Sequence, residues 1–248
     1  MNELLIFVGL LIGGVAASEI GFRIGAAFKR KDEALGSQLE VVRTATLALV
    51  AFLVAFAFSG AGNRFVDRLD VIVDEANALG TAWLRADVLP EPERSTLKTA
   101  LKEYTADRIA LLGSRDWDEI HQLLAKAGDL QGTMWAAAIA GTHGDAPLMN
   151  LVLPPLNDVF DLHSAHLAQA RRHLPAPILL VLLGAAALSL VVVGVGNGRS
   201  GRRFPVLDAI YATVLAVTLW MTVDLDHPRQ GLIQVSSQPM IDALAAMK

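Results

Sequence analysis

The sequence predicts an all-α integral membrane protein with four transmembrane helices and a helical insert between the second and the third. Apolar residues make up 53% of the 248 residues and charged residues only 19%, whereas soluble domains carry about 25% charged residues. The charge is also uneven, because residues 64–173 hold 27 of the 46 formal charges, 11 basic and 16 acidic. Apolar spans that flank a polar insert produce this distribution.

Four apolar stretches are long enough to cross a bilayer, at about residues 4–28, 44–62, 177–196 and 204–223. A helix of about 20 residues rises roughly 30 Å, which matches the hydrocarbon thickness of a membrane. The stretches show no alternation of apolar and polar residues, so we expect helices rather than barrel strands. Three regions follow: a transmembrane hairpin at 1–63, the insert at 64–173, and a second hairpin with a C-terminal tail at 174–248.

The first stretch has the length of a signal peptide, but its flanks are those of a retained helix. Met1-Asn2-Glu3 lacks a positive charge, and Lys29-Arg30-Lys31 follow the apolar run instead. A signal peptide begins with a positively charged segment. We therefore expect the first stretch to stay in the membrane.

The insert reads as a series of helices. Residues 63–89 have apolar side chains at helical spacing and follow the second span without a break, so this helix can continue that span until Pro90 ends it. A second helix is expected from Pro92 to about residue 112, and a third from about 116 to 140, with an interruption near Gly128 or Gly132 left open. After a loop at 141–147, the last helix is expected to start near residue 155.

Basic residues near the span ends predict the orientation in the membrane. The short loops carry Lys29, Arg30, Lys31, Arg43, Arg199, Arg202 and Arg203, and the other side carries Arg64, Arg68, Arg171, Arg172 and Arg229. Seven against five places both short loops in the cytoplasm, and both termini and the insert outside. Long inserts translocate largely regardless of their charge, so the insert itself does not enter the count.

Charged residues inside the spans are candidates for a polar pathway, because charge in lipid is costly and usually faces a bundle interior or water. Glu19 and Arg23 are four residues apart and share a helix face. They either line a pathway or form a pair at the membrane edge. Asp208, in the fourth span, is expected at the interface in a salt bridge near Arg202 and Arg203.

Two polar clusters resemble metal ligands, and each has a simpler interpretation. Asp224, Asp226 and His227 precede a Pro–Gly turn and could hold a cation or a basic partner, or form a hydrogen-bonded turn. Two pairs at helical spacing, Asp158 with Asp161 and His163 with His166, fit a solvated helix face better than a ligand set. We assign no metal and no cofactor.

Other function classes find little support. The chain has no cysteine, which excludes thiolate catalysis, iron–sulfur clusters and cysteine-type zinc sites. Nucleophile elbows, phosphate-binding loops, dinucleotide fingerprints and zinc-protease motifs are absent from the sequence, so we do not expect an enzyme. A net charge of −4 gives no reason to expect nucleic acid as a partner.

The most specific stretches are Glu-Ala-Asn-Ala-Leu-Gly-Thr at 75–81 and Asp-Leu-Asp-His-Pro-Arg-Gln-Gly at 224–231. With Glu19, Arg23 and Arg85 they resemble the bestrophin-like domain family of bacterial membrane proteins, over nearly the whole chain. The resemblance implies a distant likeness to bestrophin chloride channels, and therefore a homo-oligomer in a bacterial inner membrane that passes an inorganic anion. Bestrophin channels keep their soluble part in the cytoplasm, whereas the basic residues here predict a periplasmic insert.

A channel of this kind draws attention to the helix that follows the second span. Arg64 and Arg68 are one turn apart and near one face with Glu75, so a ring of them could form a charged vestibule that favours anions. The alternative is that the two arginines anchor the helix at the interface. Phe52, Phe56 and Phe58 could supply a hydrophobic gate.

Three polar residues interrupt the apolar pattern of the same helix: Glu75, Asn77 and Arg85. We expect Glu75 to pair with an arginine inside the insert, because an unpaired buried charge is very costly.

The alternative to a channel is a sensor or scaffold that transports nothing and binds a partner through its acidic insert.

Overall fold

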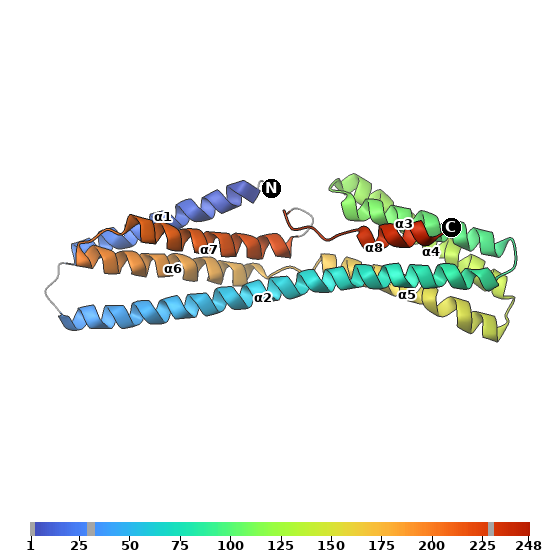
Figure 1. Ribbon diagram of the computed structural model, residues 1–248, viewed down its shortest axis with the longest axis horizontal. Helices are drawn as coiled ribbons and strands as arrows, with labels where there is room; N and C mark the ends of the chain where they lie inside the picture. Colours follow the sequence, from blue (N-terminus) through green and yellow to red (C-terminus); the bar gives the residue numbers. More distant parts are fainter. Residues whose placement is uncertain (1–2, 29–32, 228–230) are drawn as a thin grey trace. The chain divides into compact units, whose positions relative to one another are not determined.

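A computed structural model describes residues 3–28, 33–227 and 231–248 (Figure 1). These residues form eight α-helices and one short 3-10 helix, and no strand. The all-α prediction is confirmed, and four of the helices are long and apolar enough to cross a membrane. The predicted basic loop at Lys29–Lys31 and the turn residues 228–230 lie outside the described residues.

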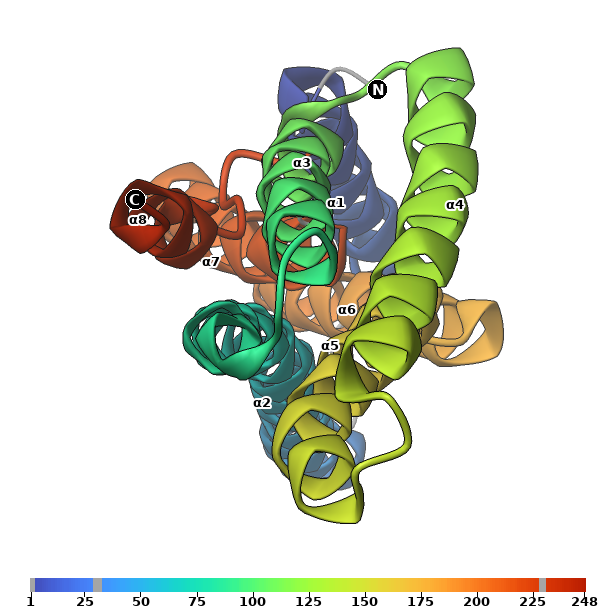
Figure 2. The ribbon, with the colours of Figure 1, turned by 90° about the vertical axis from the view of Figure 1, so that its right-hand side faces the viewer.

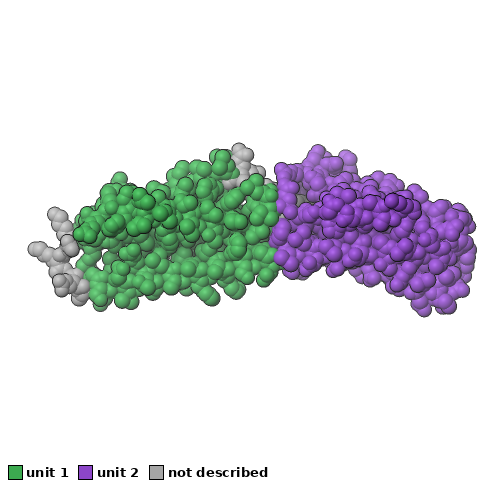
Figure 3. Space-filling view, in the orientation of Figure 1, with its two compact units in different colours: residues 1–64, 173–233 green, residues 65–172, 234–248 purple. Residues whose placement is uncertain are grey.

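The chain divides into two compact units (Figure 3). Unit 1 comprises residues 1–64 and 173–233, and unit 2 comprises residues 65–172 and 234–248. Unit 1 contains α1 (Glu3–Ala27), the first part of α2 (Glu33–Arg85), α6 (Ala176–Ser200) and α7 (Pro205–Asp226). These four helices include the four candidate membrane spans.

Glycines let α1 and α6 approach each other closely. Gly21 and Gly25 on α1 lie against the backbone of α6, and Gly194 and Gly198 on α6 lie against the backbone of α1. A Cβ atom at Gly194 would overlap the carbonyl oxygen of Ser18. Small residues at four-residue spacing are the usual means by which membrane helices pack backbone to backbone. The absence of a side chain at these four glycines therefore allows this helix pair to form.

A single 53-residue helix, α2, contributes to both units (Figure 1). The expectation that the second span continues into the insert is confirmed. The helix gives way to a 3-10 turn at Ala86–Val88 and to extended backbone at Leu89, just before Pro90. A proline disfavours helical backbone in the residue that precedes it, which accounts for this end.

Unit 2 is completed by α3 (Glu93–Gly113), α4 (Trp117–Thr142), α5 (Ala146–Ala170) and α8 (Gln238–Ala246) (Figure 2). α3 packs along α4 and α8, and α4 packs against α5. The large buried side chains of this core include Leu79, Leu97, Leu101, Tyr104, Met134, Leu156 and Met240. This core is separate from the apolar core of unit 1.

Several expectations about the insert are corrected. α4 runs through Gly128 and Gly132 without interruption. The predicted start of the last helix near residue 155 is wrong, because α5 begins at Ala146, where the Asp145 side chain accepts a hydrogen bond from Leu148 N at 3.1 Å. Residues 234–248, which the sequence grouped with the second hairpin, belong to unit 2 and include α8.

Candidate functional site

The end of α7 carries a buried carboxylate that joins three segments of unit 1. Asp226 is the last residue of α7 and is 2% exposed. Its Oδ1 accepts a hydrogen bond from Arg64 Nε on α2 at 2.9 Å, and its Oδ2 accepts one from Leu174 N at 2.7 Å. The carboxylate therefore ties the end of the second span to the segment that leads into α6.

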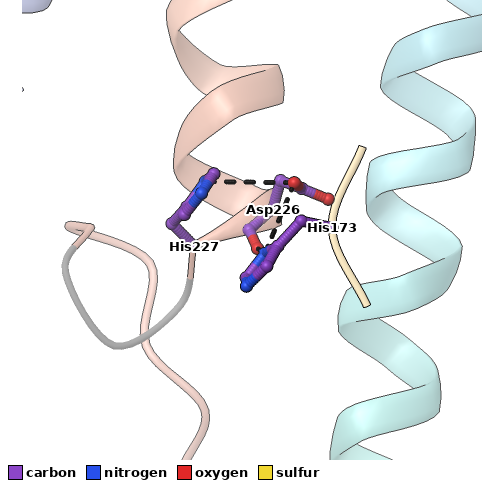
Figure 4. A group of neighbouring side chains, drawn as sticks. All are labelled: His173, Asp226 and His227. Atoms are coloured by element: carbon purple, nitrogen blue, oxygen red, sulfur yellow. Dashed lines mark hydrogen bonds and ion pairs between the residues drawn. The ribbon is translucent and has the colours of Figure 1, made fainter. Parts of the chain in front are cut away.

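Two histidines lie beside this carboxylate (Figure 4). The rings of His173 and His227 stack in parallel, with centroids 4.5 Å apart and an angle of 7° between their planes. Their Nδ1 atoms lie 3.6 and 3.9 Å from Asp226 Oδ2. His227 stands out in the sequence beside Asp226, whereas His173 does not, because a histidine 53 residues before Asp226 gives no signal in the local spacing.

Asp224 holds the chain that leaves α7. It is 2% exposed, and its two oxygens accept hydrogen bonds from Leu232 N at 2.8 Å and Ile233 N at 2.9 Å. A Cβ atom at Gly231 would collide with this carboxylate, so only glycine fits there. These contacts are those of a hydrogen-bonded turn, the simpler of the two sequence interpretations for this residue.

Arg68 and Arg64 both make contacts within the chain. Arg68 is 5% exposed, and its Nη2 donates to the carbonyl oxygen of Arg172 at 2.7 Å. The side chain of Arg64 is 25% exposed and bonded to Asp226. In the single chain these two guanidinium groups therefore serve as donors to neighbouring segments.

A fully buried polar network lies at the centre of unit 2. Glu75 is 0% exposed and accepts two hydrogen bonds from Arg108, at 2.7 Å from Nε and 2.6 Å from Nη2. Tyr104 donates to the same carboxylate at 3.0 Å, and His163 Nδ1 lies 3.0 Å from the tyrosine oxygen. The expected pairing of Glu75 with an arginine inside the insert is confirmed.

Burial and charge shift the pKa values of the groups around Glu75. Burial opposes the charge of Arg108, but the hydrogen bonds and negative charge of Glu75 outweigh it and raise the pKa of the guanidinium. Burial, and then the positive charge of Arg108, lower the pKa of His163 to about 4. Burial, together with the charge of Glu75, raises the pKa of the Tyr104 hydroxyl. At neutral pH the network is one ion pair with two neutral hydrogen-bonding neighbours.

The expectation of a solvated face around the two α5 pairs is half right. Asp158 and Asp161 are exposed. His163 and His166, by contrast, are only 7% and 8% exposed, because this face of α5 packs into unit 2. No sequence pattern distinguished the two faces of α5 at this point.

The remaining polar candidates lie in separate places. Glu19 bonds Arg23 and Arg203, each at 2.9 Å. The predicted salt bridge of Asp208 with Arg202 or Arg203 is not found among the described residues; its carboxylate accepts from Asn197 at 2.9 and 3.1 Å.

Two polar residues of the α2 motif lie apart from the Glu75 network. Asn77 is exposed, and its carbonyl oxygen accepts a hydrogen bond from the Thr81 hydroxyl at 2.9 Å. Arg85, at the end of α2, donates from Nη1 to the carbonyl oxygen of Leu151 at 3.0 Å. Arg85 therefore joins α2 to α5 within unit 2.

The face of α2 that points away from the apolar core of unit 1 is exposed. Phe52 and Phe56 are 66% and 74% exposed, and their rings stack with centroids 6.5 Å apart. At the same helical spacing follow the exposed polar residues Ser59 and Asn63, and then Asp67, Asp70 and Asp74. The exposed face thus begins with aromatic rings and ends with carboxylates.

The fold is that of an all-helical protein with four candidate membrane spans and a helical insert that buries the Glu75–Arg108 ion pair within an apolar core. The bestrophin-like domain model matches residues 9–240, and the chain belongs to this family. Among solved structures, a tryptophan-to-alanine mutant of a bacterial bestrophin homolog from Klebsiella pneumoniae is similar, with a TM-score of 0.72 and 13% identity. The match covers 100% of this chain and 97% of that chain. Comparison with curated proteins finds no match.

Proposed function

We propose that this chain is the subunit of a homo-oligomeric ion channel in a bacterial inner membrane. The observation that carries the proposal is the exposed face of α2, which presents Phe52 and Phe56 in a span whose opposite face is packed in unit 1. The family and the fold of the bacterial bestrophin homolog are consistent with it. Around a symmetry axis, this face of several copies of α2 would line a common path.

The two aromatic rings suit a narrow apolar constriction in that path. Hydrophobic constrictions gate ion flow because they lose water readily. Phe52 and Phe56 are one turn apart, so a ring of subunits would present two aromatic layers. Phe58 is 37% exposed and lies on another face of the helix.

The sign of the ion depends on which charges of α2 face the path. In the sequence, Arg64 and Arg68 favour an anion path, but in the structure both guanidinium groups are already bonded within the chain. Asp67, Asp70 and Asp74 are exposed and lie further along the same exposed face of α2 as Phe52 and Phe56; we call this row of residues the α2 stripe. Rings of carboxylates favour cations. The geometry therefore supports a cation path better than an anion path.

Reversal potentials of purified protein in planar bilayers under a salt gradient test both the channel and its selectivity. Replacing the three aspartates of the α2 stripe by asparagine should shift the reversal potential towards the anion value if they line the path. The double variant Arg64→Glu and Arg68→Glu should shift it towards cations if the arginines line it. A shift only in the second variant would reverse our choice of ion.

The second candidate, a sensor or scaffold, is favoured by the exposed acidic surface of the insert. It predicts a monomer or a dimer without an axial path, and no current at any voltage or pH. Imaging of the protein in detergent separates the two functions, since a closed ring is required for the channel. A poreless particle together with silent bilayers would leave the scaffold as the better proposal.

For topology, we propose cytoplasmic short loops and a periplasmic insert, following the basic residues. A reporter fused after Ser200 should then be active only in the cytoplasm, and one fused near Gly144 only outside. The family likeness to bestrophin channels favours the opposite arrangement, and the opposite reporter pattern would establish it without affecting the four-span fold.

A further inference from the structure

We propose that His173, Asp226 and His227 form a binding site for one zinc-type divalent metal ion. Each residue offers one ligand atom, and these atoms all lie within 4.8 Å of one another (Figure 4). His173 lies just before α6, and Asp226 and His227 lie at the end of α7. The site belongs entirely to unit 1 and is independent of the proposed channel function.

The distances are close to those of a coordinated metal. Zinc binds imidazole nitrogen and carboxylate oxygen at about 2.0–2.2 Å, so two ligand atoms of a tetrahedral site are separated by roughly 3.3 Å. The Nδ1 atoms of His173 and His227 are 3.6 and 3.9 Å from Asp226 Oδ2. Contraction by about 0.3 Å for His173 and about 0.6 Å for His227 brings each nitrogen to this separation from the carboxylate.

The carboxylate is preorganised for this role. Its side chain is 3% exposed, and Arg64 Nε and Leu174 N hold it by hydrogen bonds of 2.9 and 2.7 Å. The guanidinium contacts Oδ1, whereas the histidines face Oδ2. Ligating carboxylates are commonly hydrogen-bonded in this way by groups behind them. The contact also offsets part of the repulsion between Arg64 and a bound cation, because the carboxylate lies between them.

The histidines supply the adjustable part of the site. Each Nδ1 faces a carbonyl oxygen and therefore carries the ring proton, so ligation requires the proton to lie on Nε2 instead. The rings are also parallel, so at least one must turn about its Cβ–Cγ bond before both nitrogens point at one ion. Their side chains are 41% and 45% exposed, which leaves room for this turn. The Nδ1 atoms now contact the carbonyl oxygens of Asp226 and Val223. Val223 O keeps the backbone N–H of His227 as a donor when the ring turns away.

The ligand chemistry selects the class of metal. Two imidazoles and one carboxylate match the three-ligand zinc sites that leave a fourth position for water. Calcium and magnesium prefer oxygen ligands, and Asp224, a second buried carboxylate close by in sequence, is already bonded to Leu232 N and Ile233 N. A bound ion would clip the segment before α6 to the end of α7.

Titration of the chelator-treated full-length protein in detergent with Zn²⁺ tests the site. We expect about one ion per chain by calorimetry and elemental analysis, with millimolar Ca²⁺ unable to displace it. The double variant His173→Ala and His227→Ala should bind at least about a hundredfold more weakly. The matched control, His121→Ala with His143→Asn, removes two exposed histidines elsewhere and should bind as the wild type does.

A second readout does not depend on the variants folding. Co²⁺ in a site of nitrogen and oxygen ligands gives visible absorption whose intensity reports tetrahedral coordination, and wild-type protein should develop it with one equivalent of Co²⁺. Wild-type protein that binds no stoichiometric Zn²⁺ and shows no such spectrum would overturn the proposal. Equal binding by wild type and the His173/His227 double variant would overturn it as well. Neither result bears on whether the protein conducts ions.

Discussion

Replacing Glu75 by glutamine tests how the insert is held together. The glutamate is fully buried and receives hydrogen bonds from Arg108 and Tyr104. Glutamine keeps the volume of the side chain but removes its charge, and its amide group turns a donor towards the donors of the guanidinium. Arg108, only 1% exposed, then remains as a buried cation without its counter-charge.

The expected loss of stability is large. Breaking one partner of a buried ion pair costs about 3–5 kcal/mol, because the other charge stays desolvated. For a unit of this size, 1 kcal/mol shifts the melting temperature by roughly 4 °C, so the variant should melt about 12–20 °C below the wild type. The double variant Glu75→Leu with Arg108→Met removes both charges and should recover most of this loss. Tyr104 keeps His163 as a hydrogen-bond partner in that background.

Tryptophan fluorescence during thermal unfolding in detergent measures the effect on the correct unit. Three of the four tryptophans, Trp83, Trp117 and Trp135, belong to unit 2. Asp74→Asn is the matched control, because it removes an exposed carboxylate next to Glu75 and should leave the transition unchanged. A Glu75→Gln variant that melts within about 2 °C of the wild type would refute the reasoning.

Two further predictions concern a buried histidine and a helix contact. Because the pKa of His163 is lowered to about 4 in the folded chain, the folded state binds its proton later than the unfolded state as the pH falls. The stability that neutral His163 contributes is complete above about pH 6.5, and on the order of 3 kcal/mol of it is lost as the pH falls towards 4. The variant His163→Gln should therefore flatten the pH dependence of the melting temperature, whereas the control His121→Gln should not. Gly194→Ala places a methyl group against the backbone of α1 and should destabilise the packing of α1 on α6 by about 1–3 kcal/mol. Gly184 has open space around it, so Gly184→Ala should keep the wild-type stability when both variants are compared in a detergent-resistance assay. Parallel pH curves, or equal tolerance of both alanines, would contradict these expectations.

The sequence predicted well what depends on neighbours in the chain. The four candidate spans follow from long apolar stretches, and the continuation of α2 follows from the helical spacing of apolar side chains at 63–89 and from the absence of any proline before Pro90. These features depend on local backbone preference and on helix length. They need no knowledge of which helices meet.

Contacts between distant segments could not be predicted in the same way. The pairing of Glu75 with some arginine follows from the cost of a buried charge, but the choice of Arg108 depends on how α3 packs in unit 2. Burial of His163 depends on the same packing. The early start of α5 was missed because Pro154 and Pro155 suggest a helix start, whereas both lie inside a helix that Asp145 has already capped.

The spacing of Arg64 and Arg68 does not by itself predict which face of α2 they occupy. A separation of four residues predicts only that the two share a side of α2. Val50, 1% exposed in the core of unit 1, lies 18 residues before Arg68, which is five full turns at 3.6 residues per turn. Arg68 therefore occupies the register of the packed face, while Asp70, 18 residues after Phe52, occupies that of the exposed face. Once one apolar residue is known to be buried, helical geometry assigns Arg68 to the packed face of α2 and Asp70 to its exposed face.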